Sequence, residues 1–223
     1  MTVGVIAYRR REAEAPGEVS LSSVNSNENR RAVRIAAKTV RVITVPPVMA
    51  LALFTLLWLH GGIIGQVRDY ICSVVLLVIL PVSAYPLQRL LPSLREKGRE
   101  AQRSLAMIMS VAGYVLGVVY ALIFSTSPAI LTLFLTYLIS GTALLVINKL
   151  FGFKASGHAC GLTGPLAALA YYTGWYVLII GAVLLAAVVW SSLVMKRHTP
   201  LQLLAGGAVP VAAFALLVLL IEQ

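Results

Sequence analysis

The sequence contains few acidic residues. It has 8 Asp and Glu residues against 18 Lys and Arg residues, and its formal net charge is +10. Asp69 is the only aspartate, and no acidic residue lies between Glu100 and Glu222. The paired carboxylates of glycosidases and the aspartate clusters that hold magnesium against a diphosphate are therefore missing. The intramembrane acid of a proton- or sodium-coupled carrier is missing too.

Cysteine is equally scarce. Cys72 and Cys160 lie far apart in apolar stretches without metal-ligand spacing, which excludes a disulfide framework and a zinc site. The glycine-rich Lys-Ser/Thr motif of P-loop nucleotide sites is also absent. The chemistry that remains belongs to basic residues, histidines and hydroxyl groups.

Apolar residues make up most of the chain. They account for 59% of the 223 residues, whereas charged residues account for 12%. A soluble domain carries about 25% charged residues, so lipid is the expected solvent for most of this chain. Basic residues beside apolar spans are typical of a membrane protein, whereas a nucleic-acid-binding protein spreads them over a hydrated face. We therefore expect a bilayer partner and no nucleic acid.

Apolar segments follow one another closely from residue 43. Residues 1–42 form a polar, basic arm, and residues 43–223 form a transmembrane domain. Six of seven segments have the roughly 17–25 residues that a span needs, and the exception is short and rich in glycine. We expect an all-α, polytopic membrane bundle of six or seven helices. The segments are 43–64, 69–91, 105–125, 128–148, 158–173, 175–195 and 200–221.

The end of the arm has basic residues at helical spacing. Arg30, Arg34, Lys38 and Arg41 recur on one face, opposite valine and isoleucine. This pattern predicts a basic helix that lies on the membrane surface or leads into the first span.

Loop charge predicts the orientation. The residues before 43 and the loops 92–104, 149–157 and 196–199 carry nearly all the basic residues, whereas the opposite loops carry only Arg68. By the positive-inside rule the basic side is cytoplasmic. We expect an integral protein of the cell membrane with its N-terminus inside and, with seven spans, its C-terminus outside.

Three polar stretches are expected to emerge together on the cytoplasmic side, because two spans separate each from the next. They are the basic loop 95–103, the Lys-Ala-Ser-Gly-His stretch 154–158 and the Ser-Ser-Leu-Val-Met-Lys-Arg-His stretch 191–198. Lysine and arginine bind phosphate, and one histidine can attack phosphorus while another protonates the departing oxygen. The sequence therefore predicts a phosphate site at this membrane boundary.

At these residues the chain resembles the type 2 phosphatidic acid phosphatase superfamily, whose membrane members dephosphorylate lipid phosphates. The motifs of that family are Lys-x6-Arg-Pro, Pro-Ser-Gly-His and Ser-Arg-x5-His-x3-Asp. Residues 155–158, Ala-Ser-Gly-His, match the second motif in three of four positions. Ser191 and His198 keep the serine, the histidine and the spacing of the third. The resemblance covers roughly residues 69–221.

The resemblance implies a mechanism and a substrate class. His198 would be the nucleophile that forms a phosphohistidine, and His158 the acid that protonates the leaving lipid hydroxyl. The substrate would be a phosphatidic-acid-like lipid or an isoprenyl mono- or diphosphate, and no metal or cofactor is implied. The phosphate-binding residues would be Lys97, Arg99, Arg103, Lys154, Ser156, Gly157, Ser191 and Arg197.

The third motif departs from the family at two positions. Ser192 occupies the place of its arginine and Gln202 the place of its aspartate. The Gln202 oxygen can accept a hydrogen bond from the His198 ring and so orient it, but it provides no countercharge.

The first motif is the most degenerate. Lys97 and Arg103 are six residues apart rather than seven, and Ser104 replaces the proline. Arg99, Arg197 and Lys154 are the candidates to replace the missing cations.

Two alternatives to a phosphatase stay open, a binding scaffold and a transporter. Ser192 and Gln202 favour a catalytically inactive scaffold that binds anionic lipid or a membrane partner. Transport of a small solute is disfavoured, because the sequence has neither an intramembrane acid nor an evident internal repeat. The sequence leaves the oligomeric state undetermined.

Overall fold

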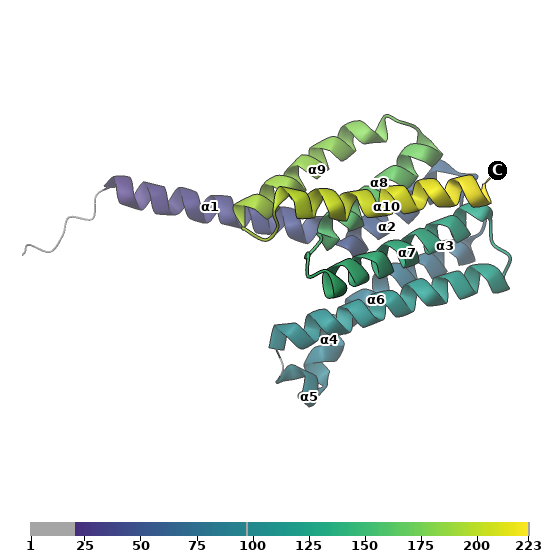
Figure 1. The fold of residues 1–223 in the computed structure, drawn as a ribbon, viewed down its shortest axis with the longest axis horizontal. Helices are drawn as coiled ribbons and strands as arrows, with labels where there is room; N and C mark the ends of the chain where they lie inside the picture. Colours follow the sequence, from purple (N-terminus) through teal and green to yellow (C-terminus); the bar gives the residue numbers. More distant parts are fainter. Residues whose placement is uncertain (1–20, 97, 223) are drawn as a thin grey trace, which may run out of the picture.

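Every regular element in the described part of the chain is a helix. The computed structural model describes residues 21–96 and 98–222, without the side chains of residues 21–27, 93, 94, 99 and 100. Most helices run along one common direction, which confirms the predicted all-α, polytopic bundle (Figure 1). The elements are α1 (Leu21–Ile43), α2 (Pro46–His60), α3 (Val67–Val74), η1 (Val75–Ile79), α4 (Leu80–Leu90), α5 (Pro92–Arg95), α6 (Gly98–Ile123), α7 (Pro128–Leu150), α8 (Gly157–Thr173), α9 (Val177–Val194) and α10 (Pro200–Ile221).

Five helical stretches in the described residues are long and apolar enough to cross a membrane. They are Val67–Leu90, Ala101–Ile123, Pro128–Leu150, Val177–Val194 and Pro200–Ile221. A sixth is the pair formed by α1 and α2, which meet at a bend of 50°. The 17 residues of α8 reach only about 26 Å at 1.5 Å per residue, short of a hydrocarbon core of about 30 Å. Six stretches thus meet the length and composition of a span, and the short α8 also runs from one end of the bundle to the other (Figure 1).

The predicted alternation of loops appears at the two ends of the bundle. The end of α1 and the connections α4–α6, α7–α8 and α9–α10 lie at one end, on the left in Figure 1. The α2–α3, α6–α7 and α8–α9 connections and the C-terminus lie at the other. We call the first, which carries the basic loops, the basic end.

Hydroxyl caps and prolines set where several helices begin. The Ser156 hydroxyl caps α8 by accepting from the Ala159 amide at 3.3 Å. Thr199 and Gln202 form a reciprocal capping box at the start of α10, with Pro200 in its first turn. Proline fits there because the first turn of a helix has no acceptor for its missing N–H.

A π-helical turn accommodates a proline inside the second span. Pro81 cannot donate to the carbonyl of Leu77, and its ring would crowd that carbonyl in a regular α-helix. The chain widens over η1, where the Leu80 amide donates to the carbonyl of Val75, five residues earlier. The predicted proline-containing span therefore stays one continuous helical rod from Val67 to Leu90.

Two glycines bring neighbouring helices into close contact with α6. A Cβ atom at Gly113 would lie 2.2 Å from the Leu76 carbonyl oxygen, and one at Gly117 would lie 2.1 Å from the Phe134 ring. Phe134 and Phe54 are central to the main apolar core, which joins α2, η1, α6, α7, α8 and α10. The Gly-x-x-x-Gly spacing thus permits close contact, as small residues do between membrane helices.

The basic arm is not separate from the bundle at its C-terminal end. The boundary at residues 42–43 falls within α1, whose last turns pack against α9. Ala37 is fully buried, whereas Arg30, Arg34 and Lys38 are exposed. The sequence left open whether this helix lies on the membrane surface or leads into the first span. Its junction with α2 favours the second alternative.

Candidate functional site

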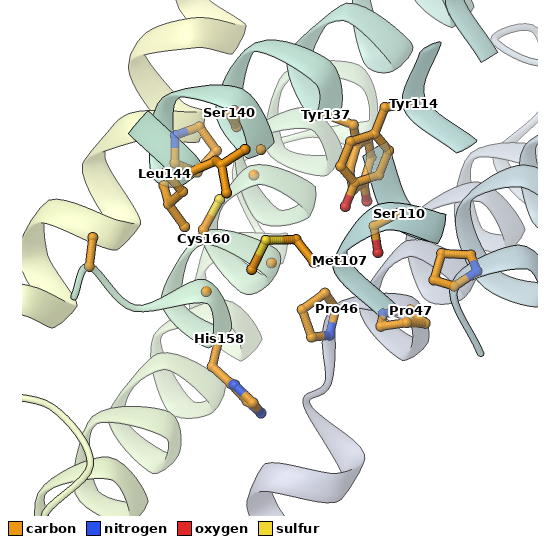
Figure 2. Close-up of a pocket in the computed structure, with 18 of the residues that line it drawn as sticks. Pro46, Pro47, Met107, Ser110, Tyr114, Tyr137, Ser140, Leu144, His158 and Cys160 are labelled. Atoms are coloured by element: carbon orange, nitrogen blue, oxygen red, sulfur yellow. The ribbon is translucent and has the colours of Figure 1, made fainter. Parts of the chain in front are cut away.

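A cavity of about 790 Å³ opens between the helices and extends from the basic end into the bundle. One section is basic and includes both predicted catalytic histidines. The other is largely apolar and includes Met107, Leu133 and Leu144 (Figure 2). The charged and imidazole side chains of the basic section are Arg41, Arg103, Lys149, Lys154, Arg197, His158 and His198.

The basic section has no acidic counterpart. No Asp or Glu among the described residues lines the cavity, although five cationic side chains do. Like charges gathered in a partly desolvated pocket repel one another, and an anion relieves this repulsion. The electrostatics of the cavity therefore favour a negatively charged ligand.

Both ring nitrogens of His158 contact one residue. The Arg41 guanidinium Nη2 is 3.4 Å from Nδ1, and the Arg41 carbonyl oxygen is 3.3 Å from Nε2. A guanidinium only donates and a carbonyl only accepts, so the ring is neutral, with its proton on Nε2. Burial and then the Arg41 charge lower the pKa of His158 to about 4, since both disfavour the imidazolium. His158 lies in the first turn of α8, outside the candidate spans.

His198 is held by the backbone of the α7–α8 loop. Its Nδ1 atom is 3.1 Å from the Lys154 carbonyl oxygen. That carbonyl can only accept, so Nδ1 carries the proton of the neutral ring and Nε2 keeps its lone pair, the arrangement that a nucleophile needs. Burial is the main cause that lowers the pKa of His198. The Lys154 carbonyl and the Gln202 side chain oppose this effect, and the charges of Arg41 and Arg103 add to it.

Lys154 adopts an unusual backbone conformation at this contact. Its φ angle is +59°, in the left-handed region that costs about 1–2 kcal/mol for a residue with a Cβ atom. The neighbouring loop is tied to α10, which holds this conformation in place. Strained backbone of this kind tends to occur at functional sites.

Gln202 ties that loop down, in addition to its side-chain interaction with His198. Its Nε2 atom donates to the Phe153 carbonyl at 2.8 Å, and its Oε1 atom accepts from the Thr199 amide at 3.1 Å. Its own carbonyl accepts from the Ser156 amide at 3.0 Å. Gln202 therefore acts on His198 both directly and through the loop that carries the Lys154 carbonyl.

The other sequence-predicted site residues differ in whether they line the cavity. Arg103, Lys154, Gly157 and Arg197 line the cavity together with both histidines. Three do not line it. Ser156 is a buried helix cap, the buried Ser191 donates to the Val188 carbonyl at 3.0 Å, and Gln202 lies behind the loop. Lys97 and the side chain of Arg99 lie outside the described residues.

Sequence reasoning missed Lys149 and, more importantly, Arg41 as site residues. The Nη1 atom of Arg41 donates to the Ser192 hydroxyl at 3.1 Å across 151 residues. Ser192 occupies the position at which the resembled motif has an arginine, so a guanidinium from α1 reaches the place where that arginine is missing. A signal existed, because Arg41 is the last cation of the basic stripe, but only the fold could pair it with Ser192.

No group of three or more His, Cys, Asp or Glu side chains that could hold a metal ion occurs in the part of the chain that the structure describes.

The fold and the cavity define a polytopic α-helical membrane protein with a basic, histidine-containing cavity at one end. Comparisons with protein-family models, curated proteins and solved structures found no match for this chain.

Proposed function

We propose that this protein is a lipid phosphatase that binds the phosphate of a membrane lipid in the basic section of the cavity. The observation that carries the proposal is the convergence of His158, His198 and five cations in one acid-free cavity that continues into an apolar section. The phosphate would lie among the cations, and the apolar section would take the lipid chain. The same features support the resemblance at residues 155–158 and 191–198.

The phosphate would be held by charge and by backbone amides. Arg41, Lys154 and Arg197 come from three different segments, so an anion between them is contacted from several sides. The Gly157 amide lies in the first turn of α8, where N–H groups have no acceptor within the helix and can bind an anion.

The reaction would follow from the states of the two histidines. Once phosphate is bound, His158 takes up a proton. Nε2 of His198 then attacks phosphorus, the bond from phosphorus to the lipid oxygen breaks, and that oxygen takes the added proton from His158, which returns to its neutral form. Water then attacks the phosphohistidine, which releases inorganic phosphate and restores the ring. The bound phosphate would raise the pKa of His158 from its resting value of about 4, since a nearby anion stabilises the imidazolium.

A binding scaffold without turnover is the second candidate. It is favoured by the contacts of Arg41 with both nitrogens of His158, which keep that ring neutral and occupied. It is also favoured by Gln202, which brings no countercharge to His198. In this alternative the cavity would bind an anionic lipid or a membrane partner unchanged.

We further propose that the basic end faces the cytoplasm of a cell membrane. The support is the positive-inside rule applied to loops that lie at one end of the bundle (Figure 1). The C-terminus would then face outward. A C-terminal alkaline phosphatase fusion should be active and a C-terminal fluorescent-protein fusion dark, and the opposite pattern would reverse this orientation.

Phosphate release from lipids tests the function. The purified full chain is offered phosphatidic acid and isoprenyl mono- and diphosphates in mixed micelles without added metal. His198→Ala should lower release by about 10³-fold or more, because it removes the nucleophile. His158→Ala should lower it by about 10²–10⁴-fold, the usual size of an acid–base contribution.

The matched control is Lys196→Gln. This exposed residue belongs to the same loop as His198 but does not line the cavity, so release should persist. Equal release by wild type and both histidine variants would overturn the mechanism. Lipid binding without any release would favour the scaffold.

A further inference from the structure

Hydroxyl groups line the inner part of the cavity. Tyr137 and Ser140 lie one turn apart on the cavity face of α7, and Ser110 and Tyr114 lie on the facing side of α6. Figure 2 shows the Tyr114 and Tyr137 hydroxyls pointing the same way, toward Ser110. The two tyrosine rings are 5.6 Å apart at their centroids. The apolar section is therefore not uniformly apolar.

Two of these hydroxyls have no hydrogen-bond partner among the described residues. They are the Tyr137 hydroxyl and the Ser140 Oγ atom, and Ser140 is only 3% exposed. Nearby hydroxyls are satisfied, since Ser110 donates to the Ala106 carbonyl and Thr136 to the Thr132 carbonyl. The Thr126 and Thr132 hydroxyls also lack a partner in the described part of the chain, but these residues do not line the cavity. An unpartnered polar group is costly within a bilayer, so a ligand that supplies an acceptor would offset this cost.

The helix packing positions Tyr114 beside Tyr137. A Cβ atom at Gly141 would lie 2.8 Å from Cε2 of Tyr114, so the absence of a side chain there lets the ring lie against α7. The pair thus forms an inner wall of the cavity.

The hydroxyls lie deeper in the bundle than the phosphate site. Asn148 lies near the basic end of α7, and Ser140 and Tyr137 lie 8 and 11 residues before it, about 12 and 16 Å along the helix at 1.5 Å per residue. Cys160, only two residues after His158, also lines the cavity between α7 and α8 (Figure 2). The hydroxyls thus line the path along which a lipid held by its phosphate would extend into the bundle.

We propose that Tyr137 and Ser140 form a subsite for acceptor oxygens in the lipid itself. Ester carbonyls of a glycerolipid provide such acceptors close to the phosphate, whereas an isoprenyl chain has none. A site built to hydrogen-bond a ligand rejects an analogue that lacks the group, because its own polar atoms are then left unpaired. The subsite therefore selects an ester-linked glycerolipid phosphate. This inference rests on the proposed phosphate-binding function of the same cavity.

Binding and turnover are measured separately to test it. The full chain in detergent is titrated with phosphatidic acid, with its dialkyl ether analogue, which lacks only the carbonyls, and with an isoprenyl monophosphate. Affinity is read from intrinsic fluorescence and thermal stabilisation, and phosphate release is followed in parallel. The wild type should bind the ester lipid about 3- to 10-fold more tightly than the other two, as expected for one or two hydrogen bonds.

The variants are Tyr137→Phe and Ser140→Ala, alone and combined. The double variant should bind the ester lipid no better than the ether lipid and bind the isoprenyl phosphate unchanged. It should also unfold at the same or a higher temperature without lipid, since it removes unpartnered groups. Thr142→Val is the matched control, because Thr142 is an exposed residue of α7 that does not line the cavity.

The outcomes separate the two proposals. Equal affinity of the wild type for all three lipids, or an ester preference that survives in the double variant, overturns the subsite while leaving the phosphatase intact. An ester preference with no phosphate release overturns the phosphatase and keeps the subsite. No binding of any lipid overturns both.

Discussion

Arg41 and His158 lie 117 residues apart in the chain and contact each other twice. The guanidinium Nη2 is 3.4 Å from one ring nitrogen, and the Arg41 carbonyl oxygen is 3.3 Å from the other. This arrangement couples α1 to the cavity, because the residue that contacts the imidazole belongs to the helix that leads into the first span. The proposed chemistry requires a phosphate to compete for the guanidinium.

Removing the Arg41 guanidinium should weaken phosphate binding. Charge-assisted hydrogen bonds are worth about 1.5–3 kcal/mol, so Arg41→Ala should lower kcat/KM for a lipid phosphate by about 10- to 150-fold. Arg41→Lys should retain part of the activity, since it keeps the charge but not the forked donors. Lys38→Ala is the matched control, because Lys38 is exposed on the same helix. A similar loss in both alanine variants would point to a general role of α1 charge instead.

Stability should fall as the pH is lowered from about 6.5 toward 4. The folded pKa of His158 is about 4 against an ordinary value of 6.5, so the unfolded chain takes up its proton first as the pH falls. The stabilising contribution is thus present above about pH 6.5 and is lost as the pH falls through that range. The pKa of His198 is also lowered, so His198 contributes to the same loss of stability at low pH.

Thermal unfolding measured between pH 7.5 and 4.5 checks this expectation. His158→Gln should flatten the pH dependence, whereas His60→Gln, which changes an exposed histidine at the opposite end of the bundle, should leave it unchanged. An identical pH profile in the wild type and His158→Gln would contradict the neutral, buried state of His158.

Exchanging the amide of Gln202 for a carboxylate should not raise the proposed phosphatase activity. Gln202→Glu keeps the acceptor for the Thr199 amide but loses the donor to the Phe153 carbonyl, so the loop that holds His198 should loosen. We expect phosphate release to fall about tenfold, with lipid affinity nearly unchanged, since about 1.4 kcal/mol corresponds to a factor of ten. A rise in release would instead show that Gln202 simply stands in for the aspartate of the resembled motif.

Gly206 is needed for α10 to pass close to the loop before α8. A Cβ atom there would lie 2.4 Å from the Ser156 carbonyl oxygen and 2.7 Å from its nitrogen. Gly206→Ala should therefore displace the loop and cost about 1–3 kcal/mol of stability, measured by thermal unfolding in detergent, and release should fall with it. Gly207→Ala is the control, because its Cβ atom would meet side-chain atoms and no backbone, the nearest being the Thr163 methyl carbon at 3.3 Å.

Much of the fold could be predicted because a bilayer restricts what a chain can do. Long apolar runs must form helices, since no water is available to bond exposed backbone groups, and this gave the bundle and the opposite ends of its loops. The helix boundaries were less certain, because α2 and α8 are short and caps such as Ser156 and Thr199 decide where α8 and α10 begin.

The candidate site was predictable only in part. Motif spacing brought attention to His158, His198 and Lys154, which line one cavity. It also suggested Ser191 and Ser156, whose hydroxyls bond to backbone groups instead. Residue type alone does not say whether a serine near a motif points into a cavity or caps a helix.

The amino-acid sequence by itself determined three features: that most of the chain suits a lipid environment, that it is all-helical, and that its basic loops lie at one end. Hydropathy and loop charge decide these features because both are local properties of the chain. Tertiary structure alone decided that the Arg41 guanidinium reaches Ser192 and His158, and that the Tyr137 and Ser140 hydroxyls lack partners in the cavity. Those relationships depend on how helices rotate and pack against one another, and no spacing along the chain encodes that rotation.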